Sequence, residues 1–190
     1  MDDDELLRCL ARDLDAAFEA LVRSHQDRLY SIALRFLGDP RDAEEVAQDT
    51  LLRAYRALAR YDPTRIRELR LRAWLATIAI RQCRTRALRK RVATTELMAE
   101  GPTAPNARPA ETPHELSARR EGAEEWAALV TALPDRYRAA VVLRHVDGLS
   151  YPEMSEVLGR PEGTVKAQVH RGLALLRAAF EAAEREESIA

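Results

Sequence analysis

Hydrophobic positions along this chain recur at three- and four-residue spacing almost throughout, and this spacing predicts helices. One such stripe predicts a long helix over residues 14–37, which Gly38 ends. Asp39 and Pro40 suit the N-cap and the first position of a second helix, which we expect to run to about Arg60. Since no stretch shows the β-branched alternation of a strand, we expect an all-α protein.

The helical pattern breaks at Asp62-Pro63 and again beyond Arg91. The first break predicts a loop up to about Arg70, followed by a helix through Trp74. The second begins a stretch with four prolines in the run GPTAPNARPAETP and few large apolar residues. Such a stretch buries too little to offset its ordering entropy, so we interpret it as a flexible linker. The pattern therefore predicts two small helical domains, at 1–91 and 113–190, joined by a linker at 92–112.

The second domain contains a helix-turn-helix pattern between Ser150 and Leu176. Ser150 and Glu153 have capping-box spacing, and Gly159 suits the turn that ends the first helix. The second helix has an apolar stripe and an opposite face of small, polar and cationic residues. That face comprises Gly163, Thr164, Ala167, His170 and Arg171, with Lys166 and Gln168 on its flanks. This arrangement is typical of a major-groove reader, although a plain helical hairpin with a solvated outer face has a similar pattern.

Charge is segregated along the chain although the formal net charge is only −1. The segment from Arg65 to Arg91 holds ten arginines or lysines and a single acid, Glu68, and the flanking segments are acidic. Such a block predicts a local anion site, and nucleic-acid phosphates are the obvious ligand. The alternative is a solvated surface helix covered by the acidic segments.

The chain shows no arrangement typical of an enzyme or a metal site. Cys9 and Cys83 have no metal-ligand or redox spacing, and Cys83 falls on an apolar helix face, as a core residue would. We find no Ser/His/Asp array and no Gly-rich phosphate loop, so we expect no catalysis, cofactor or metal. Without a signal peptide or a long apolar run, we expect a cytoplasmic protein that does not insert into membranes.

Three motifs together resemble one family. Residues 133–177, LPDRYRAAVVLRHVDGLSYPEMSEVLGRPEGTVKAQVHRGLALLR, resemble the fourth domain of extracytoplasmic-function (ECF) sigma factors of bacterial RNA polymerase. Residues 38–58, GDPRDAEEVAQDTLLRAYRAL, are similar to the part of the second sigma domain that binds the polymerase clamp. Residues 72–91, RAWLATIAIRQCRTRALRKR, are similar to its part that melts the promoter and reads the minus-ten element. The resemblance implies a non-catalytic subunit that directs core RNA polymerase to promoters.

The resemblance also implies roles for individual residues. Polymerase binding falls to Asp42, Glu45, Gln48, Asp49 and Arg53. Minus-ten DNA binding falls to Arg65, Arg67, Arg70, Arg72, Arg81, Arg84 and Arg86. Minus-thirty-five DNA binding falls to Arg160, Glu162, Gly163, Thr164, Lys166, Ala167, Gln168, His170 and Arg171. The implied partners are core RNA polymerase, promoter DNA and an anti-sigma factor. Arg81 and Thr85 stand where the family often has Asn and Asp, so the family's minus-ten preference is not carried over.

Two other functions are compatible with parts of the pattern. The GTVK stretch at 163–166 is shared with helix-turn-helix response regulators, which would be dimers with a sensor domain. The arginine-rich helix alone would also suit an RNA-binding protein or an enzyme. Duplex promoter binding without polymerase would favour the regulator, and RNA binding by residues 65–91 would favour the second alternative.

Overall fold

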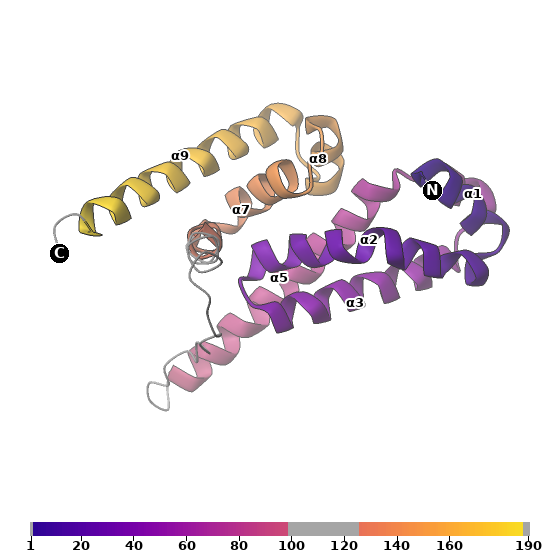
Figure 1. Cartoon of the computed structure of the whole chain (residues 1–190), viewed down its shortest axis with the longest axis horizontal. Coiled ribbons are helices and arrows are strands. Elements are labelled where there is room, and N and C mark those ends of the chain that lie inside the picture. The colour runs from indigo at the N-terminus through magenta and orange to yellow at the C-terminus, as the bar shows by residue number, and fades with distance from the viewer. Residues whose placement is uncertain (1, 99–125, 188–190) are drawn as a thin grey trace, which may run out of the picture.

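The computed structural model describes residues 2–98 and 126–187, and every regular element within these ranges is helical (Figure 1). The expected all-α fold is therefore confirmed. The elements are α1 (Asp3–Arg12), α2 (Leu14–Leu37), α3 (Pro40–Leu58), α4 (Pro63–Arg67), α5 (Leu71–Met98), α7 (Asp135–Val141), the π-helical turn η1 (Val142–Val146), α8 (Tyr151–Leu158) and α9 (Glu162–Glu187).

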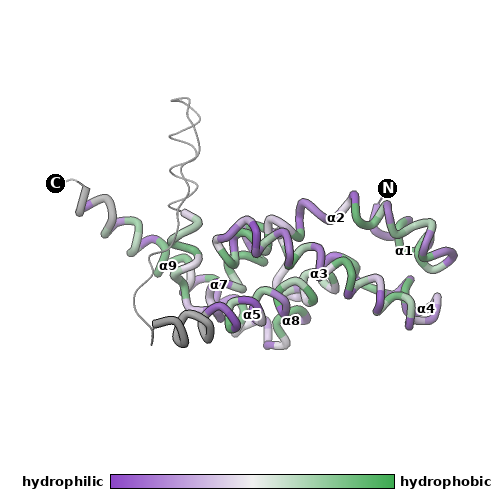
Figure 2. Tube along the Cα trace, turned by 90° about the horizontal axis from the view of Figure 1, so that it is seen from below, coloured by the Kyte–Doolittle hydropathy of each residue, from purple (hydrophilic) through white to green (hydrophobic). Residues whose placement is uncertain are grey.

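The N-terminal domain is a bundle of α2, α3 and α5 (Figure 1), with α1 and α4 together at one end (Figure 2). The caps follow the sequence signals: the Asp39 carboxylate accepts hydrogen bonds from two backbone amides of the first turn of α3, and Gly38 ends α2 with a φ of 74°. Figure 2 shows hydrophilic and hydrophobic positions alternating along α2 and α3, as expected for helices with one buried face.

Three features of this domain differ from the sequence-based expectations. Helix α1 was not expected, yet its Leu6, Leu7 and Leu10 are all buried. The expected loop at 62–70 contains the short helix α4, whose N-cap is Asp62. Helix α5 continues to Met98, so residues 92–98 of the expected linker are helical. The remainder of that linker, residues 99–112, lies outside the described residues.

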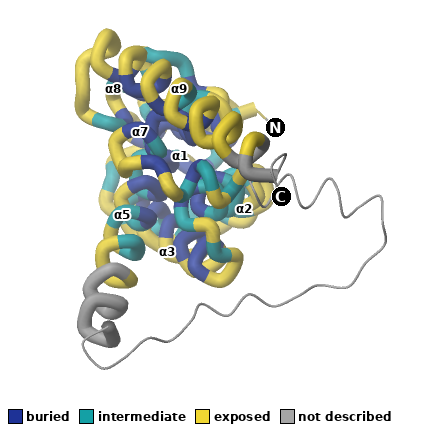
Figure 3. Tube along the Cα trace, turned by 90° about the vertical axis from the view of Figure 1, so that its left-hand side faces the viewer, coloured by how far each residue is buried: buried dark blue, intermediate teal, exposed yellow. Residues whose placement is uncertain are grey.

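The C-terminal domain consists of a helical segment at 126–132 followed by α7, η1, α8 and α9. Helices α7 and α9 cross closely at Gly172, where an added Cβ would lie 2.6 Å from Val141 Cγ2. The outer sides of α8 and α9 are exposed (Figure 3), and α9 extends well beyond the rest of its domain (Figure 1). Phe180 on this extension is 47% exposed.

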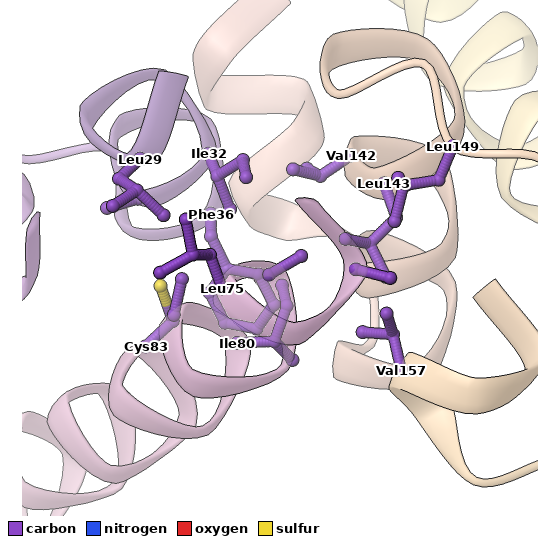
Figure 4. Packing of buried hydrophobic residues seen from close by; sticks show 14 of the residues in the cluster. Leu29, Ile32, Phe36, Leu75, Ile80, Cys83, Val142, Leu143, Leu149 and Val157 are labelled. Carbon is purple, nitrogen blue, oxygen red and sulfur yellow. The ribbon is translucent and has the colours of Figure 1, made fainter. Parts of the chain in front are cut away.

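The two domains share one hydrophobic core. Figure 4 shows Phe36 and Leu75 of the N-terminal domain on one side of this core and Val142 and Leu143 of the C-terminal domain on the other. All four side chains are fully buried. Cys83 is also fully buried, which confirms it as a core residue, and burial raises the pKa of its thiol to about 12.

Candidate functional site

The outer face of α3 presents most of the residues expected to bind polymerase. Glu45, Gln48, Asp49 and Arg53 are exposed at three- and four-residue spacing, so they share one side of the helix. Leu52, which lies among them, is 46% exposed. An exposed leucine surrounded by charged and amide groups has the character of a protein-binding surface. We call these five residues the α3 face.

Asp42 does not belong to this exposed surface, although the sequence placed it there. Its residue is only 7% exposed, and its carboxylate lies 2.7 Å from Arg86 Nη2 and 3.1 Å from Lys90 Nζ. The physical reason is helical periodicity, because Asp42 is four residues before the buried Val46 and therefore lies on the inward stripe. Asp42 thus holds α5 against α3 and is not available for docking.

Arg86 is expected to contact minus-ten DNA but is occupied by the same ion-pair cluster. Besides Asp42, its guanidinium lies 2.5 Å from Glu45 Oε2 on α3. Hydrogen bonding to the Asp42 carboxylate raises the pKa of Arg86. A guanidinium with two carboxylate partners has its charge already compensated within the protein, so Arg86 is a weak candidate for a phosphate contact.

A basic groove with two aromatic rings runs between the end of α3 and the middle of α5. Its volume is about 590 Å³, and its lining residues include Arg53, Arg56, Arg60, Tyr61, Trp74 and Arg81. The rings of Tyr61 and Trp74 have centroids 6.2 Å apart, and the Arg65 guanidinium lies 3.8 Å from the Tyr61 ring centroid. Arginines beside aromatic faces are the combination with which proteins bind single-stranded nucleic acid.

Sequence reasoning missed Arg56, Arg60 and Tyr61 as part of this groove. A signal was present, because Arg53 and Arg56 on α3 and Arg60 just after its end recur at three- and four-residue spacing. Of the expected minus-ten residues, the structure brings Arg81 into the groove and places Arg65 on its Tyr61 wall. Arg67 lies outside the groove lining, and its Nε donates to the backbone oxygen of Pro63, 3.1 Å away.

Three other expected minus-ten residues contact the C-terminal domain. Arg70 Nη1 lies 2.6 Å from Glu156 Oε1, and Arg84 Nε lies 3.0 Å from Asp135 Oδ2. Arg72 Nη2 donates to the backbone oxygen of Asp147 across 2.7 Å. The basic block identified from sequence is therefore divided into a groove, an intradomain ion-pair cluster and a set of interdomain contacts.

The helix-turn-helix forms as the sequence predicted. Ser150 and Glu153 make the capping box, with Ser150 N donating to Glu153 Oε2 across 2.8 Å, and the hydrogen bonds from Ser150 lower the pKa of Glu153. Gly159 ends α8 with a φ of 61°. Of the expected minus-thirty-five residues, eight are exposed at the turn or on α9: Arg160, Glu162, Gly163, Thr164, Lys166, Ala167, His170 and Arg171.

Gln168 is the exception on α9, because it is buried at 7% exposure and its Oε1 has no hydrogen-bond partner among the described residues. The sequence placed it on the flank of the exposed face. Its position three residues after Val165 and four before Gly172 instead puts it within the apolar stripe. Gln168 therefore supports the position of α9 and does not face DNA in this structure.

Comparisons with known proteins match both domains. Residues 21–93 match the family model described as sigma-70 region 2, and residues 123–176 match sigma-70 region 4. The match to region 2 decides between a sigma factor and an ordinary helix-turn-helix regulator. The chain belongs to the ECF sigma factors. It is a sigma factor that directs transcription initiation.

Individual relatives agree with this assignment. ECF RNA polymerase sigma factor SigW of Bacillus subtilis (strain 168) is 32% identical over 176 residues, covering 85% of this chain and 87% of the relative. SigE of Mycolicibacterium smegmatis is 35% identical over 164 residues, and the match spans 60% of that longer relative. Among solved structures, CnrH in complex with the cytosolic domain of CnrY is similar with a TM-score of 0.69 and 28% identity, covering 95% of this chain and 97% of CnrH.

Residues 2–98 and 126–187 contain neither a membrane-spanning helix nor a metal-binding cluster. No helix in these ranges is long and apolar enough to cross a membrane. No group of three or more His, Cys, Asp or Glu residues within them is arranged to hold a metal ion.

Proposed function

We propose that this sigma factor binds core RNA polymerase through the α3 face and reads promoter DNA at two separate surfaces. The basic groove takes the opened minus-ten strand, and the exposed face of α9 reads the minus-thirty-five element. The protein acts as a non-catalytic specificity subunit in the cytoplasm, and its domains correspond to sigma domain two at 1–91 and sigma domain four at 113–190. An anti-sigma factor is a further proposed partner, as the ECF sigma-factor resemblance implies; the similar CnrH is solved in complex with the cytosolic domain of CnrY.

The observation that carries this proposal is the position of the basic groove beside the α3 face. Arg53 belongs to both, because it is exposed on α3 and also lines the groove. A strand entering the groove would therefore lie next to the polymerase surface. Arg56, Arg60 and Arg81 supply positive charge for the backbone, and Tyr61 and Trp74 supply faces on which bases can stack.

The α9 surface supports duplex reading in the major groove. In this proposal the exposed Lys166 and Arg171 contact phosphates, and the exposed His170 and Glu162 contact base edges. Phosphate contacts fix the register of the helix, and base-edge contacts supply sequence preference.

The proposal is tested by transcription with purified core polymerase and a pool of genomic fragments, followed by mapping of transcript starts. We expect starts that share two upstream elements and that depend on this chain. Arg60→Ala with Arg81→Ala should reduce open-complex formation, detected by permanganate reactivity of unpaired thymines. Arg23→Ala is the matched control, since Arg23 is an exposed arginine on α2 outside the groove lining. Core polymerase that starts at the same sites without the chain would contradict the proposal.

A further inference from the structure

We infer that Gln82 on α5 reads one base of the opened minus-ten strand and selects adenine at that position. The inference rests on the proposed function and deepens it, because it names the residue that gives the basic groove a sequence preference. Its basis is the chemistry of the groove lining, in which Gln82 is the only amide side chain.

Gln82 lies on the side of α5 that forms one wall of the groove. The α5 residues of the lining recur at three- and four-residue spacing, and α3 lies alongside and supplies the facing wall (Figure 1). Gln82 is partly buried, and its side chain forms no hydrogen bond with another described residue. Its amide is therefore available to a ligand in the groove.

The two aromatic rings lie at the other end of the groove from Gln82. Tyr61, just beyond α3, lies beside Trp74, whereas Arg86, four residues after Gln82, pairs with Glu45 in the first half of α3. Trp74 and Gln82 are eight residues apart, which is about 12 Å along the axis of α5. Since a stacked strand advances only about 3.4 Å per nucleotide, the rings and Gln82 meet different nucleotides.

The arginines and rings of the lining distinguish bases poorly. Arg53, Arg56 and Arg60 form no ion pair with a described residue, so their charge is available to phosphates, which every sequence carries. Stacking on Tyr61 and Trp74 also tolerates any sequence, because every base has a π-face. A sequence preference in the groove therefore needs a side chain that matches the edge of one base.

The amide of Gln82 matches adenine on the edge that bases present in the major groove. There adenine offers the N7 acceptor beside the 6-amino donor, so the amide nitrogen donates to N7 while the amide oxygen accepts from the amino group. Guanine offers two acceptors on the same edge and therefore suits an arginine. Cytosine and thymine offer one polar group each, so neither can hold both halves of the amide.

Two neighbours of Gln82 are less suited to this role. Thr85 is not part of the groove lining, and its Oγ1 donates to the backbone oxygen of Arg81 across 3.0 Å. Arg81 belongs to the lining and is exposed, but a guanidinium has no acceptor, so it matches a phosphate or guanine. Selection of adenine therefore falls to Gln82.

The test is transcription by the reconstituted holoenzyme from a promoter library randomised across the minus-ten element. We expect the wild type to prefer adenine at one position. Gln82→Leu removes the amide at nearly constant size and should reduce that preference about five- to hundredfold. Gln82→Glu keeps an acceptor and loses the donor, so the preference should move toward cytosine. Gln26→Leu is the matched control, since Gln26 is an exposed glutamine on α2, and it should change no preference.

Base analogues at the selected position connect the effect to one edge of adenine. 7-Deazaadenine lacks N7 and the purine deoxynucleoside lacks the 6-amino group, so each should lower transcription by the wild type. Neither should lower transcription by Gln82→Leu further, because the contact is already absent. Far-UV circular dichroism identifies variants that have lost helix content, and the analogues with the wild type provide the test in that case.

Several results would overturn the inference. One is a wild-type adenine preference that survives in Gln82→Leu, and another is a loss of transcription in this variant that is equal for all minus-ten sequences. A wild type that does not select adenine, or that is insensitive to both analogues, would overturn it as well. A guanine preference that disappears in Arg81→Ala would assign the reading to Arg81 instead. Failure of the proposed function would appear separately, as absence of chain-dependent transcription starts.

Discussion

Arg28 and Asp147 form a bidentate ion pair between two residues 119 positions apart in the sequence. One lies in the middle of α2 and the other directly after η1, so the pair joins the N-terminal helical bundle to the domain that contains the helix-turn-helix. Its carboxylate is fully buried at the contact between the two domains, where both domains also contribute apolar core residues.

Removing one partner of this pair should destabilise the whole chain. Asp147→Ala leaves the Arg28 guanidinium largely buried without its carboxylate, and we expect a loss of about 3 kcal/mol in the free energy of unfolding. Glu19→Ala breaks the exposed pair with Arg23 and should cost less than about 1 kcal/mol. Urea denaturation followed by circular dichroism measures the unfolding free energy of both variants. Equal losses would show that the buried Arg28–Asp147 pair stabilises the chain no more than the exposed Glu19–Arg23 pair does.

Gly172 should be required for the close crossing of α7 and α9. An alanine there would place its Cβ 2.6 Å from Val141 Cγ2 and 3.4 Å from the backbone oxygen of Tyr137. We expect Gly172→Ala to cost about 1–3 kcal/mol through overpacking. Gly163→Ala, on the same helix with open space around it, is the control and should not destabilise the protein in thermal unfolding.

The two acidic residues Asp42 and Asp49 on α3 should have different roles, Asp42 in stability and Asp49 in polymerase binding. Asp42→Asn removes the charge that pairs with Arg86 and Lys90, so it should lower the unfolding free energy. Asp49→Arg reverses an exposed charge on the α3 face and should weaken core-polymerase binding at least tenfold with unchanged stability. Surface-plasmon-resonance affinity for core enzyme and urea midpoints separate the two effects, and the same pattern from both variants would contradict the assignment.

Stability should fall in mild acid because of His25. This side chain is 5% exposed, its imidazole nitrogens have no hydrogen-bond partner among the described residues, and Nε2 lies 3.4 Å from Asp3 Oδ1. The pKa of His25 is lowered, chiefly by burial. The nearby Arg28 and Arg72 lower it further, whereas the carboxylates of Asp3 and Asp147 act in the opposite direction. The unfolded chain therefore takes up a proton more readily than the folded one.

It follows that the contribution of neutral His25 is fully present above about pH 6.5 and is lost as the pH falls through the lowered folded pKa. Urea midpoints measured across this range should decrease toward acid in the wild type, and His25→Gln should have a flatter profile. A wild-type profile that rises toward acid would contradict the direction of the shift.

Much of the fold could be predicted because local signals agree with it. Gly38 and Pro40 at the turn between α2 and α3, and the capping box at Ser150, act within one or two helical turns and appear as expected. Helix α1 escaped prediction because it is short and begins with an acidic run, although its leucines have helical spacing. Its stability comes from packing, which the local sequence does not report.

The candidate sites could be predicted only in part. Asp42 and Gln168 are polar residues on buried stripes. Their polarity and the family resemblance assigned them to exposed binding surfaces, but packing buries both side chains. The interdomain contact could not be predicted at all. An apolar stripe shows that a helix face is buried but not which partner covers it, so nothing local pairs Arg28 with Asp147.

The most direct test of the two-surface account is transcription by the reconstituted holoenzyme from a promoter library randomised across both elements. The account predicts that His170→Ala changes the preferred bases in the upstream element alone, by about 1–3 kcal/mol for each lost base contact. Lys166→Ala should reduce transcription from all promoter sequences alike. Gln168→Leu should leave the preferred upstream bases unchanged. Arg60→Ala should reduce promoter opening without altering the preferred bases of the upstream element. Identical upstream preferences in wild type and His170→Ala, together with full opening by Arg60→Ala, would contradict the account.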